Sequence, residues 1–234
     1  MKKILQITFL LISPILFAQL PQSLLKVAEE VPNFDEYTGS VYQTSNYKDA
    51  SLIDEKSGTF EAKLKYNIYS DVLEFKNSSG TYEIVQNKTT HARIGEDYFY
   101  FCEFNDQRGR DKSGYYVLVE LTDNYRIYKK YSINVVNPQK RNTPSGTDTP
   151  GKLAAETRYF LEQNNMIMEL PMNKKEILIA LSDKESELSN YIKKEKIKVR
   201  KEEDLIRLVS RYNALKSSST GPSRSLLSSN GNRN

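Results

Sequence analysis

The sequence has very little of the chemistry on which metal sites and nucleophilic active sites depend. Its 234 residues include one cysteine, Cys102, one histidine, His91, and no tryptophan. A zinc site built from Cys and His needs three or four ligands, and an intramolecular disulfide needs two cysteines, so both are excluded. The sequence contains no G-x-S-x-G or H-E-x-x-H motif and no glycine-rich phosphate loop. We therefore expect no catalytic residue, no metal and no cofactor.

The composition limits the class of protein and the class of partner. Charged residues make up 27% of the chain and hydrophobic residues 38%, which is polar for a globular protein. The 16 Tyr and 9 Phe residues are nevertheless too many for a wholly disordered chain. The formal net charge is only +4, without the clustered basic excess that nucleic-acid-binding proteins carry. We expect one or two folded domains and no nucleic-acid partner.

Residues 1–18 have the pattern of a secretory signal peptide. A short cationic start precedes an apolar stretch, and Ala18 supplies a small residue at the expected cleavage site before Gln19. A transmembrane helix is the alternative, but spanning a bilayer takes about 20 apolar residues, and Pro14 interrupts the stretch. We expect cleavage near Ala18 and Gln19, no transmembrane segment afterwards, and a periplasmic or extracellular location.

Between residues 39 and 137 the hydrophobic pattern repeats every second residue, as it does in β-strands. Residues 60–68 are the clearest example, with five apolar side chains on one face and polar side chains on the other. Turn-forming clusters such as residues 77–80 separate consecutive short strands. Residues 98–104 are aromatic on both faces, which predicts a strand covered on both sides or lining a cavity. This pattern predicts an antiparallel meander, either an open curved sheet or a partial barrel.

The remaining segments differ from this β region. Residues 19–38 form a mixed N-terminal segment, in which residues 23–30 could make two helical turns. Residues 138–152 contain three Pro, two Gly and no aliphatic residue, which is typical of a linker. Residues 153–215 predict a β-hairpin followed by three short amphipathic helices. Residues 216–234 are rich in Ser without any acidic residue and should be disordered. The fold class that follows is α+β.

One stretch of the chain resembles a known family. Residues 64–74, Leu-Lys-Tyr-Asn-Ile-Tyr-Ser-Asp-Val-Leu-Glu, resemble a YNxYxDxxE strand-turn-strand found in small, uncharacterised secreted proteins of Bacteroidota, Flavobacteria-like bacteria among them. Residues 128–131 and the basic helical stretch 188–213 resemble further elements of these proteins. The family has no assigned activity, so the resemblance implies an architecture and export, and it implies no mechanism. The helical C-terminus differs from a β-rich sorting domain, so the resemblance favours the periplasm.

Four single residues are candidates for chemistry. Asp71 and Glu74 could form the carboxylate pair of a glycan hydrolase. We favour a turn-forming role for Asp71 and a solvent-facing strand position for Glu74. His91 is expected at the surface or across a strand pair. Cys102 has aromatic neighbours and is expected to pack as a small hydrophobic residue.

Three larger features are candidates for binding. Residues 108–112, Arg-Gly-Arg-Asp-Lys, could recognise anionic head groups or glycans, although a solubilising hairpin tip is the simpler interpretation. Residues 193–201 are the densest basic run and could touch an anionic membrane face, with a solvated helical surface as the alternative. The Tyr-rich strands could form the floor of a glycan or lipid site, or the aromatic side chains could simply fill the sheet.

Together these observations favour a non-enzymatic binding or scaffolding module of the cell envelope. Its partner would be an envelope protein, a glycan or a lipid. The first alternative is a carrier of a lipid or other hydrophobic ligand, held in a pocket under the Tyr-rich sheet. The second alternative is a carboxylate-based hydrolase of an unrecognised kind, which would need Asp71 or Glu74 to converge with another carboxylate in a cleft.

Overall fold

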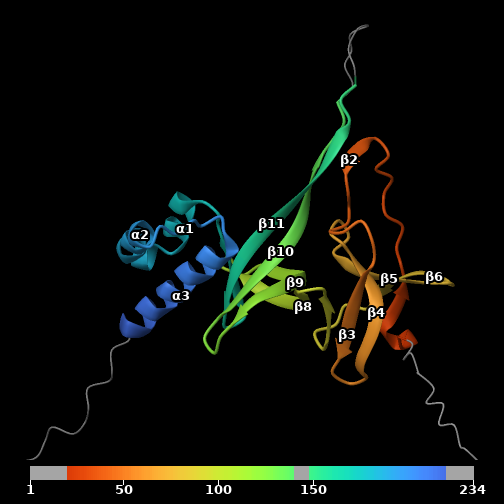
Figure 1. The fold of residues 1–234 in the computed structure, drawn as a ribbon, viewed down its shortest axis with the longest axis horizontal. Helices are drawn as coiled ribbons and strands as arrows, with labels where there is room; N and C mark the ends of the chain where they lie inside the picture. The colour runs from red at the N-terminus through yellow and green to blue at the C-terminus, as the bar shows by residue number, and fades with distance from the viewer. Residues whose placement is uncertain (1–19, 140–147, 220–234) are drawn as a thin grey trace, which may run out of the picture.

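The computed structural model describes residues 20–139 and 148–219, so the expected signal peptide lies outside the described residues. Within these ranges, twelve strands belong to one sheet, and the helices follow at the C-terminal end (Figure 1). The strands are β1 (Leu25–Val27), β2 (Tyr37–Gly39), β3 (Lys48–Asp54), β4 (Gly58–Asn67), β5 (Val72–Asn77), β6 (Gly80–Ile84), β7 (Thr90–Ile94), β8 (Asp97–Asp106), β9 (Asp111–Leu121), β10 (Arg126–Val136), β11 (Gly151–Gln163) and β12 (Met166–Leu170). This mostly antiparallel sheet with a helical C-terminus confirms the predicted α+β fold.

The sheet branches at β8, because two different strands, β7 and β12, pair with the same edge of this strand. Along one edge, β8 pairs with β9 from Tyr98 to Asn105. Along the other edge, its first residues pair with β7, while Asn105 and Asp106 pair with Met166 and Ile167 of β12. Since β12, β11, β10 and β9 are also paired in this order, the five strands β8 to β12 form a closed ring. All pairings within the ring are antiparallel except the one between β8 and β12.

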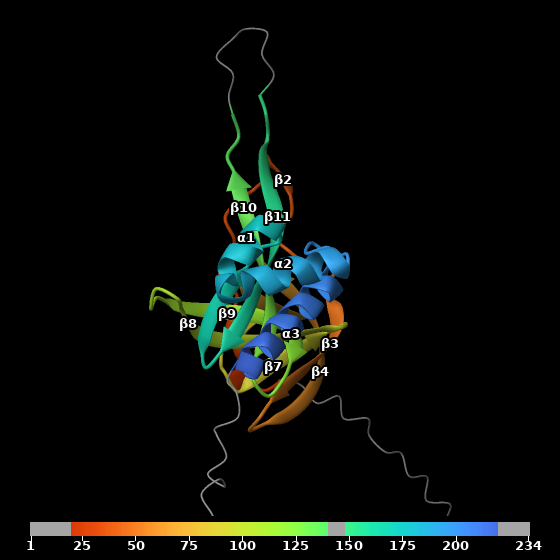
Figure 2. The same cartoon turned by 90° about the vertical axis from the view of Figure 1, so that its left-hand side faces the viewer.

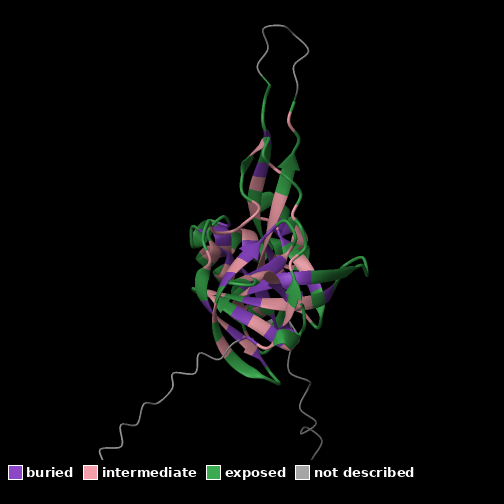
Figure 3. Cartoon of the chain, turned by 90° about the vertical axis from the view of Figure 1, so that its right-hand side faces the viewer, coloured by how far each residue is buried: buried purple, intermediate pink, exposed green. Residues whose placement is uncertain are grey.

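The remaining strands form a second lobe that begins with β7, the other neighbour of β8. Their order is β7-β3-β4-β5-β6-β1. Its pairings are antiparallel, and β3 to β6 follow one another as the predicted meander. Leu64, Tyr66 and Ile68 of the alternating stretch are buried in its core, together with Leu52 and Leu73. The period-two pattern therefore identified the inner face of this lobe correctly, and Figure 3 shows the buried residues gathered in the body of the molecule.

The N-terminal segment is largely extended and does not form the two helical turns that residues 23–30 could have made. Residues 22–24 form a single 3-10 turn, and the chain then enters β1, which pairs with β6. Leu20 and Leu24 are both buried against the core of the second lobe. Pairing with β6 satisfies the backbone groups of residues 25–27, which explains why this segment is a strand rather than a helix.

The segment expected to be a linker connects two strands of one sheet. β10 and β11 pair along eleven residues, from Arg126 opposite Glu162 to Val136 opposite Lys152, and project from the body as an arm (Figure 2). Gln139 and Thr149 form one further bridge, whereas residues 140–147 lie outside the described residues. We expected residues 138–152 to link two separate units. Instead, the strand before this segment, β10, pairs with the strand after it, β11, in one sheet.

The helices pack on the face of the ring that β10, β11 and β12 present. They are α1 (Lys174–Ala180), α2 (Glu185–Lys194) and α3 (Glu202–Ser219), with a 3-10 turn at Ser182–Lys184. Asn173 caps α1, since its side chain accepts a hydrogen bond from the backbone of Lys175 at 2.9 Å. Figure 2 shows these helices in front of the strands, and the shared core includes Ile127, Leu161, Leu170, Leu188, Leu205 and Leu208. α3 continues to Ser219, so the first residues of the expected disordered tail are helical, and the rest of it lies outside the described residues.

Candidate functional site

Aromatic side chains fill the centre of the five-stranded ring. Each strand contributes at least one residue to this cluster, namely Phe104 and Cys102 of β8, Tyr116 and Leu118 of β9, Tyr128 of β10, Phe160 of β11 and Ile167 of β12. The ring of Tyr116 makes edge contacts with Phe104 and Phe160, at centroid distances of 5.2 and 5.8 Å. These contacts pack the aromatic rings against one another in the interior of the ring of strands.

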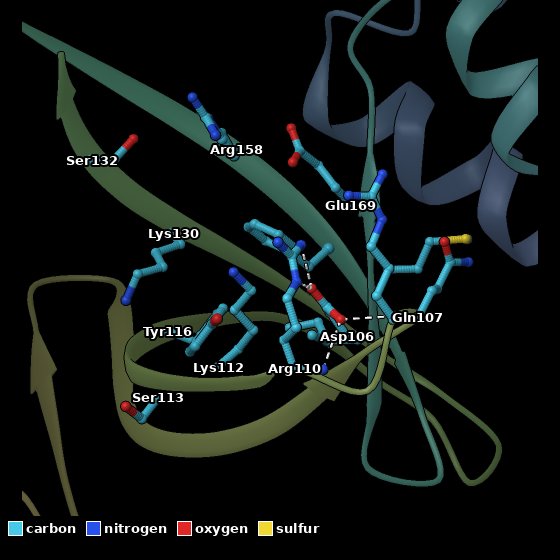
Figure 4. Close-up of a pocket in the computed structure, with 14 residues that line it drawn as sticks. Asp106, Gln107, Arg110, Lys112, Ser113, Tyr116, Lys130, Ser132, Arg158 and Glu169 are labelled. Atoms are coloured by element: carbon cyan, nitrogen blue, oxygen red, sulfur yellow. Dashed lines mark hydrogen bonds and ion pairs between the residues drawn. The ribbon is translucent and has the colours of Figure 1, made fainter.

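A pocket of about 460 Å³ lies against this aromatic cluster (Figure 4). Tyr116, Phe160 and Ile167 form its apolar wall, and Ser113 and Ser132 add hydroxyl groups. The charged residues that line the pocket are Arg108, Arg110, Lys112, Lys130 and Arg158 on the basic side, and Asp106 and Glu169 on the acidic side. Five basic residues against two acidic ones give the pocket a net positive charge.

Asp106 holds the loop between β8 and β9 in shape. Its carboxylate accepts hydrogen bonds from the backbone of Arg108 at 2.8 Å and of Arg110 at 3.0 Å, and it pairs with the Arg110 guanidinium at 2.6 Å. The hydrogen bond from the Arg110 side chain is the main reason that the pKa of Asp106 is lowered to about 2. Asp106 is therefore ionised at neutral pH, and its negative charge neutralises the positive charge of Arg110.

Two of the basic residues have no such partner. Arg108 and Lys112 form no ion pair with any residue in the described ranges 20–139 and 148–219. Arg158 pairs only with Glu156, at 3.1 Å, and both of these side chains are largely exposed. An ion pair between exposed side chains is weak, so Arg158 can be drawn to an anion with little loss. The charge of these three residues is available to a ligand.

Lys130 connects the pocket to the second lobe. Its ammonium group lies 2.7 Å from a carboxylate oxygen of Asp71 and 4.6 Å above the ring of Tyr116. Asp71 lies in the turn between β4 and β5 with a φ of 56°, and it also accepts a hydrogen bond from the hydroxyl of Tyr66 at 2.6 Å. The expected turn-forming role of Asp71 agrees with this geometry. In addition, the residue joins the two lobes beside the pocket, which the sequence did not indicate.

Glu74 lies elsewhere, and the expectation that it faces solvent is wrong. Its exposure is only 4%, because Tyr42 and Tyr47 lie over this face of the second lobe. Its carboxylate accepts hydrogen bonds from the side-chain amide of Asn67 at 2.9 Å and the hydroxyl of Tyr47 at 3.4 Å. None of these groups contacts Asp71, so the structure does not bring the two carboxylates to a common partner.

His91 and Cys102 have the surroundings that the sequence indicated. His91 of β7 stacks on Tyr100 of the neighbouring strand with a centroid distance of 4.7 Å, and burial lowers its pKa. Cys102 of β8 packs against the aromatic cluster of the ring. Burial raises the pKa of its thiol to about 12, which leaves almost no reactive thiolate at neutral pH.

Of the two remaining binding candidates, residues 193–201 lie outside the pocket, and the Tyr-rich strands contribute a single tyrosine to it. In residues 193–201, at the end of α2 and in the following loop, Ile197 and Val199 are buried and the basic side chains are exposed, away from the pocket lining. Among the Tyr-rich strands, Tyr66 and Tyr115 are each only 2% exposed and fill the core of the second lobe. Tyr116 is the tyrosine that lines the pocket.

Comparisons with known proteins add no assignment to this site. No family model, curated protein or solved structure matches the chain. Among residues 20–139 and 148–219, no group of three or more His, Cys, Asp or Glu side chains is placed to hold a metal ion. In the same part of the chain, no helix is both long enough and apolar enough to cross a membrane.

Proposed function

We propose that the protein is an exported, non-enzymatic binding module of the cell envelope that takes up an anionic ligand in the pocket at the end of the five-stranded ring. The observation that carries this proposal is the basic excess of the pocket over an aromatic wall. The cationic and apolar pattern of residues 1–18 supports export.

The chemistry of the basic residues suits a carboxylate or a phosphate group. The guanidinium groups of Arg108 and Arg158 offer paired donors that match the oxygens of such anions. Lys112 adds a compact charge, and Lys130 lies at the inner side next to Tyr116. The side chain of Lys130 is only 22% exposed, so water screens its attraction to an anion less than it screens that of the exposed Arg108, Lys112 and Arg158.

The acidic residue that shapes the pocket is poorly suited to proton transfer. A general acid or base works best when its pKa lies near the working pH. Arg110 and the loop backbone hold the pKa of Asp106 at about 2, so this carboxylate stays ionised and bound to its own loop. This supports binding over hydrolysis as the role of the pocket.

The proposal can be tested with paired ligands that differ in charge alone. We would titrate residues 19–234 with organic phosphates and carboxylates and with their neutral alcohol counterparts, following binding by calorimetry. The Arg108→Ala/Lys112→Ala variant should bind the anions about 10-fold or more weakly, since each removed contact is a charge-assisted hydrogen bond. The matched control is Lys56→Ala/Lys76→Ala, which removes the same charge from exposed positions outside the pocket. Equal losses in the two variants would contradict a specific site.

A further inference from the structure

A second, largely apolar pocket of about 280 Å³ lies next to the basic pocket, between the β11–β12 hairpin and the last turns of α3. Its wall includes Leu161, Met166, Met168 and Tyr212, together with the polar residues Gln163, Asn164 and Lys216. The side chain of Met166 is exposed, although it is large and apolar. Methionine side chains are flexible and polarisable, so a wall of this kind adapts to an alkyl chain more readily than a wall of branched residues would.

The two pockets are neighbours that share part of their lining along β12. Gln107, Ile167 and Met168 line both of them, with Gln107 at the tip of the loop that Asp106 organises. In Figure 4, Gln107 lies beside Asp106 on the side of the pocket that faces the helices. The shared residues, Gln107 among them, therefore place an apolar surface next to the basic pocket.

From this juxtaposition we infer that the ligand is an anionic amphiphile, with its charged group in the basic pocket and its alkyl chain along Met166 and Met168. This inference rests on the proposed function and specifies its ligand class. Charge selects the head group, because Arg108, Lys112 and Arg158 line only the basic pocket. Apolar burial then selects the tail, because Leu161 and Met166 line only the second pocket. A fatty-acid carboxylate and the phosphate of a single-chain lipid share this chemistry.

Chain length is the variable that tests the inference. We would compare butanoate, decanoate, decyl phosphate and decanol below their aggregation limits, by calorimetry and by protein NMR. Each methylene that is removed from water strengthens binding by roughly fourfold. We expect the second pocket to bury about three of the additional methylenes of decanoate, which should make decanoate bind about 60-fold more tightly than butanoate. Decanol should bind much more weakly than decanoate because it lacks the charge.

A pair of exposed apolar residues supplies a variant and its control. Met166→Glu places a carboxylate in the path of the tail at a position that is 52% exposed, so the fold should tolerate it. It should remove most of the advantage of decanoate, because the added charge weakens the binding of both anions while the lost apolar contact affects decanoate alone. Ile179→Glu on α1 makes a similar change at a position that is 61% exposed and outside both pockets. This control should retain the full dependence on chain length.

The outcomes separate the two proposals. If no anion binds at any chain length, both the proposed function and the amphiphile inference fail. If butanoate binds as tightly as decanoate, or if Met166→Glu and Ile179→Glu behave alike, the inference fails while the proposed function stands. Decanol binding as tightly as decanoate would overturn both. A dependence on chain length supports the inference, with a preference for decanoate indicating a fatty acid and a preference for decyl phosphate indicating a lipid head group.

Discussion

Replacement of Gly114 by alanine should uncouple the two lobes beside the pocket. Gly114 has a φ of 139°, and a Cβ atom at this position would overlap a carboxylate oxygen of Asp71 and the ammonium group of Lys130. The Lys130 chain end can move, but Asp71 is also fixed by the hydroxyl of Tyr66 and the backbone amide of Tyr115. The substitution should therefore expel the Asp71 carboxylate from its partners.

The free energy of unfolding should fall for two separable reasons. A side chain at such a positive φ costs about 1–3 kcal/mol of backbone strain. Loss of the Asp71 hydrogen bonds should add about 2 kcal/mol, a figure that allows for the partial exposure of Asp71 and Lys130. Gly80→Ala isolates the first contribution, because Gly80 has a φ of 147° and a Cβ atom added there would meet no other atom within 4 Å.

Urea and thermal unfolding, followed by far-ultraviolet circular dichroism, would measure both variants. Gly114→Ala should be less stable than Gly80→Ala by about 2 kcal/mol, or about 4–8 °C in Tm. In an Asp71→Gly background the excess should vanish, since the clashing carboxylate is gone and glycine tolerates the φ of 56°. Equal losses for the two alanine variants, or an excess that persists without Asp71, would refute this reasoning.

Three further predictions concern other contacts. The pKa of Asp106 is about 2 when folded and about 3.9 when unfolded. The stability difference between the wild type and Asp106→Asn should therefore be constant above about pH 5 and shrink as the pH falls towards 2, as measured by urea midpoints. Cys102 should react with iodoacetamide at pH 8 about 100-fold more slowly in the folded protein than in urea, followed by mass spectrometry. Tyr159→Phe should cost about 1 kcal/mol in urea unfolding, because the Tyr159 hydroxyl donates to Glu202 of α3 at 2.7 Å, and an unchanged stability would contradict this.

The local elements could be predicted from the sequence because their signals are local. The alternation in residues 60–68 predicted β4 and its buried face. Asn164 and Asn165 connect β11 to β12 with φ values of 53° and 64°, which asparagine adopts more readily than most residues. The capping role of Asn173 follows from the same short-range chemistry.

Contacts between distant segments could not be predicted in this way. Leu73 and Phe75 flank Glu74 and direct it away from the main core, but only the fold shows that Tyr42 and Tyr47 cover it there. The candidate site depends on such contacts throughout. The loop at residues 108–112 was recognised as basic, whereas Lys130 and Arg158 join it only because β9, β10 and β11 are neighbours in the ring. The one sequence signal for these residues was the period-two pattern. This pattern indicates which face of a strand a side chain occupies, but it does not indicate which strands lie beside that strand.

The closure of the ring also has a consequence for the order in which the chain folds. The strand that completes the ring, β12, pairs with β8 although Met166 and Asn105 are 61 positions apart in the sequence. As the chain is synthesised from its N-terminus, the backbone of Asn105 and Asp106 stays unpaired on its outer edge until β12 has been made. Until then the aromatic residues Phe104, Tyr116 and Tyr128 lack their cover from Ile167. The nascent protein therefore passes through a stage with an open strand edge beside exposed aromatics, which is when a chaperone would protect it most.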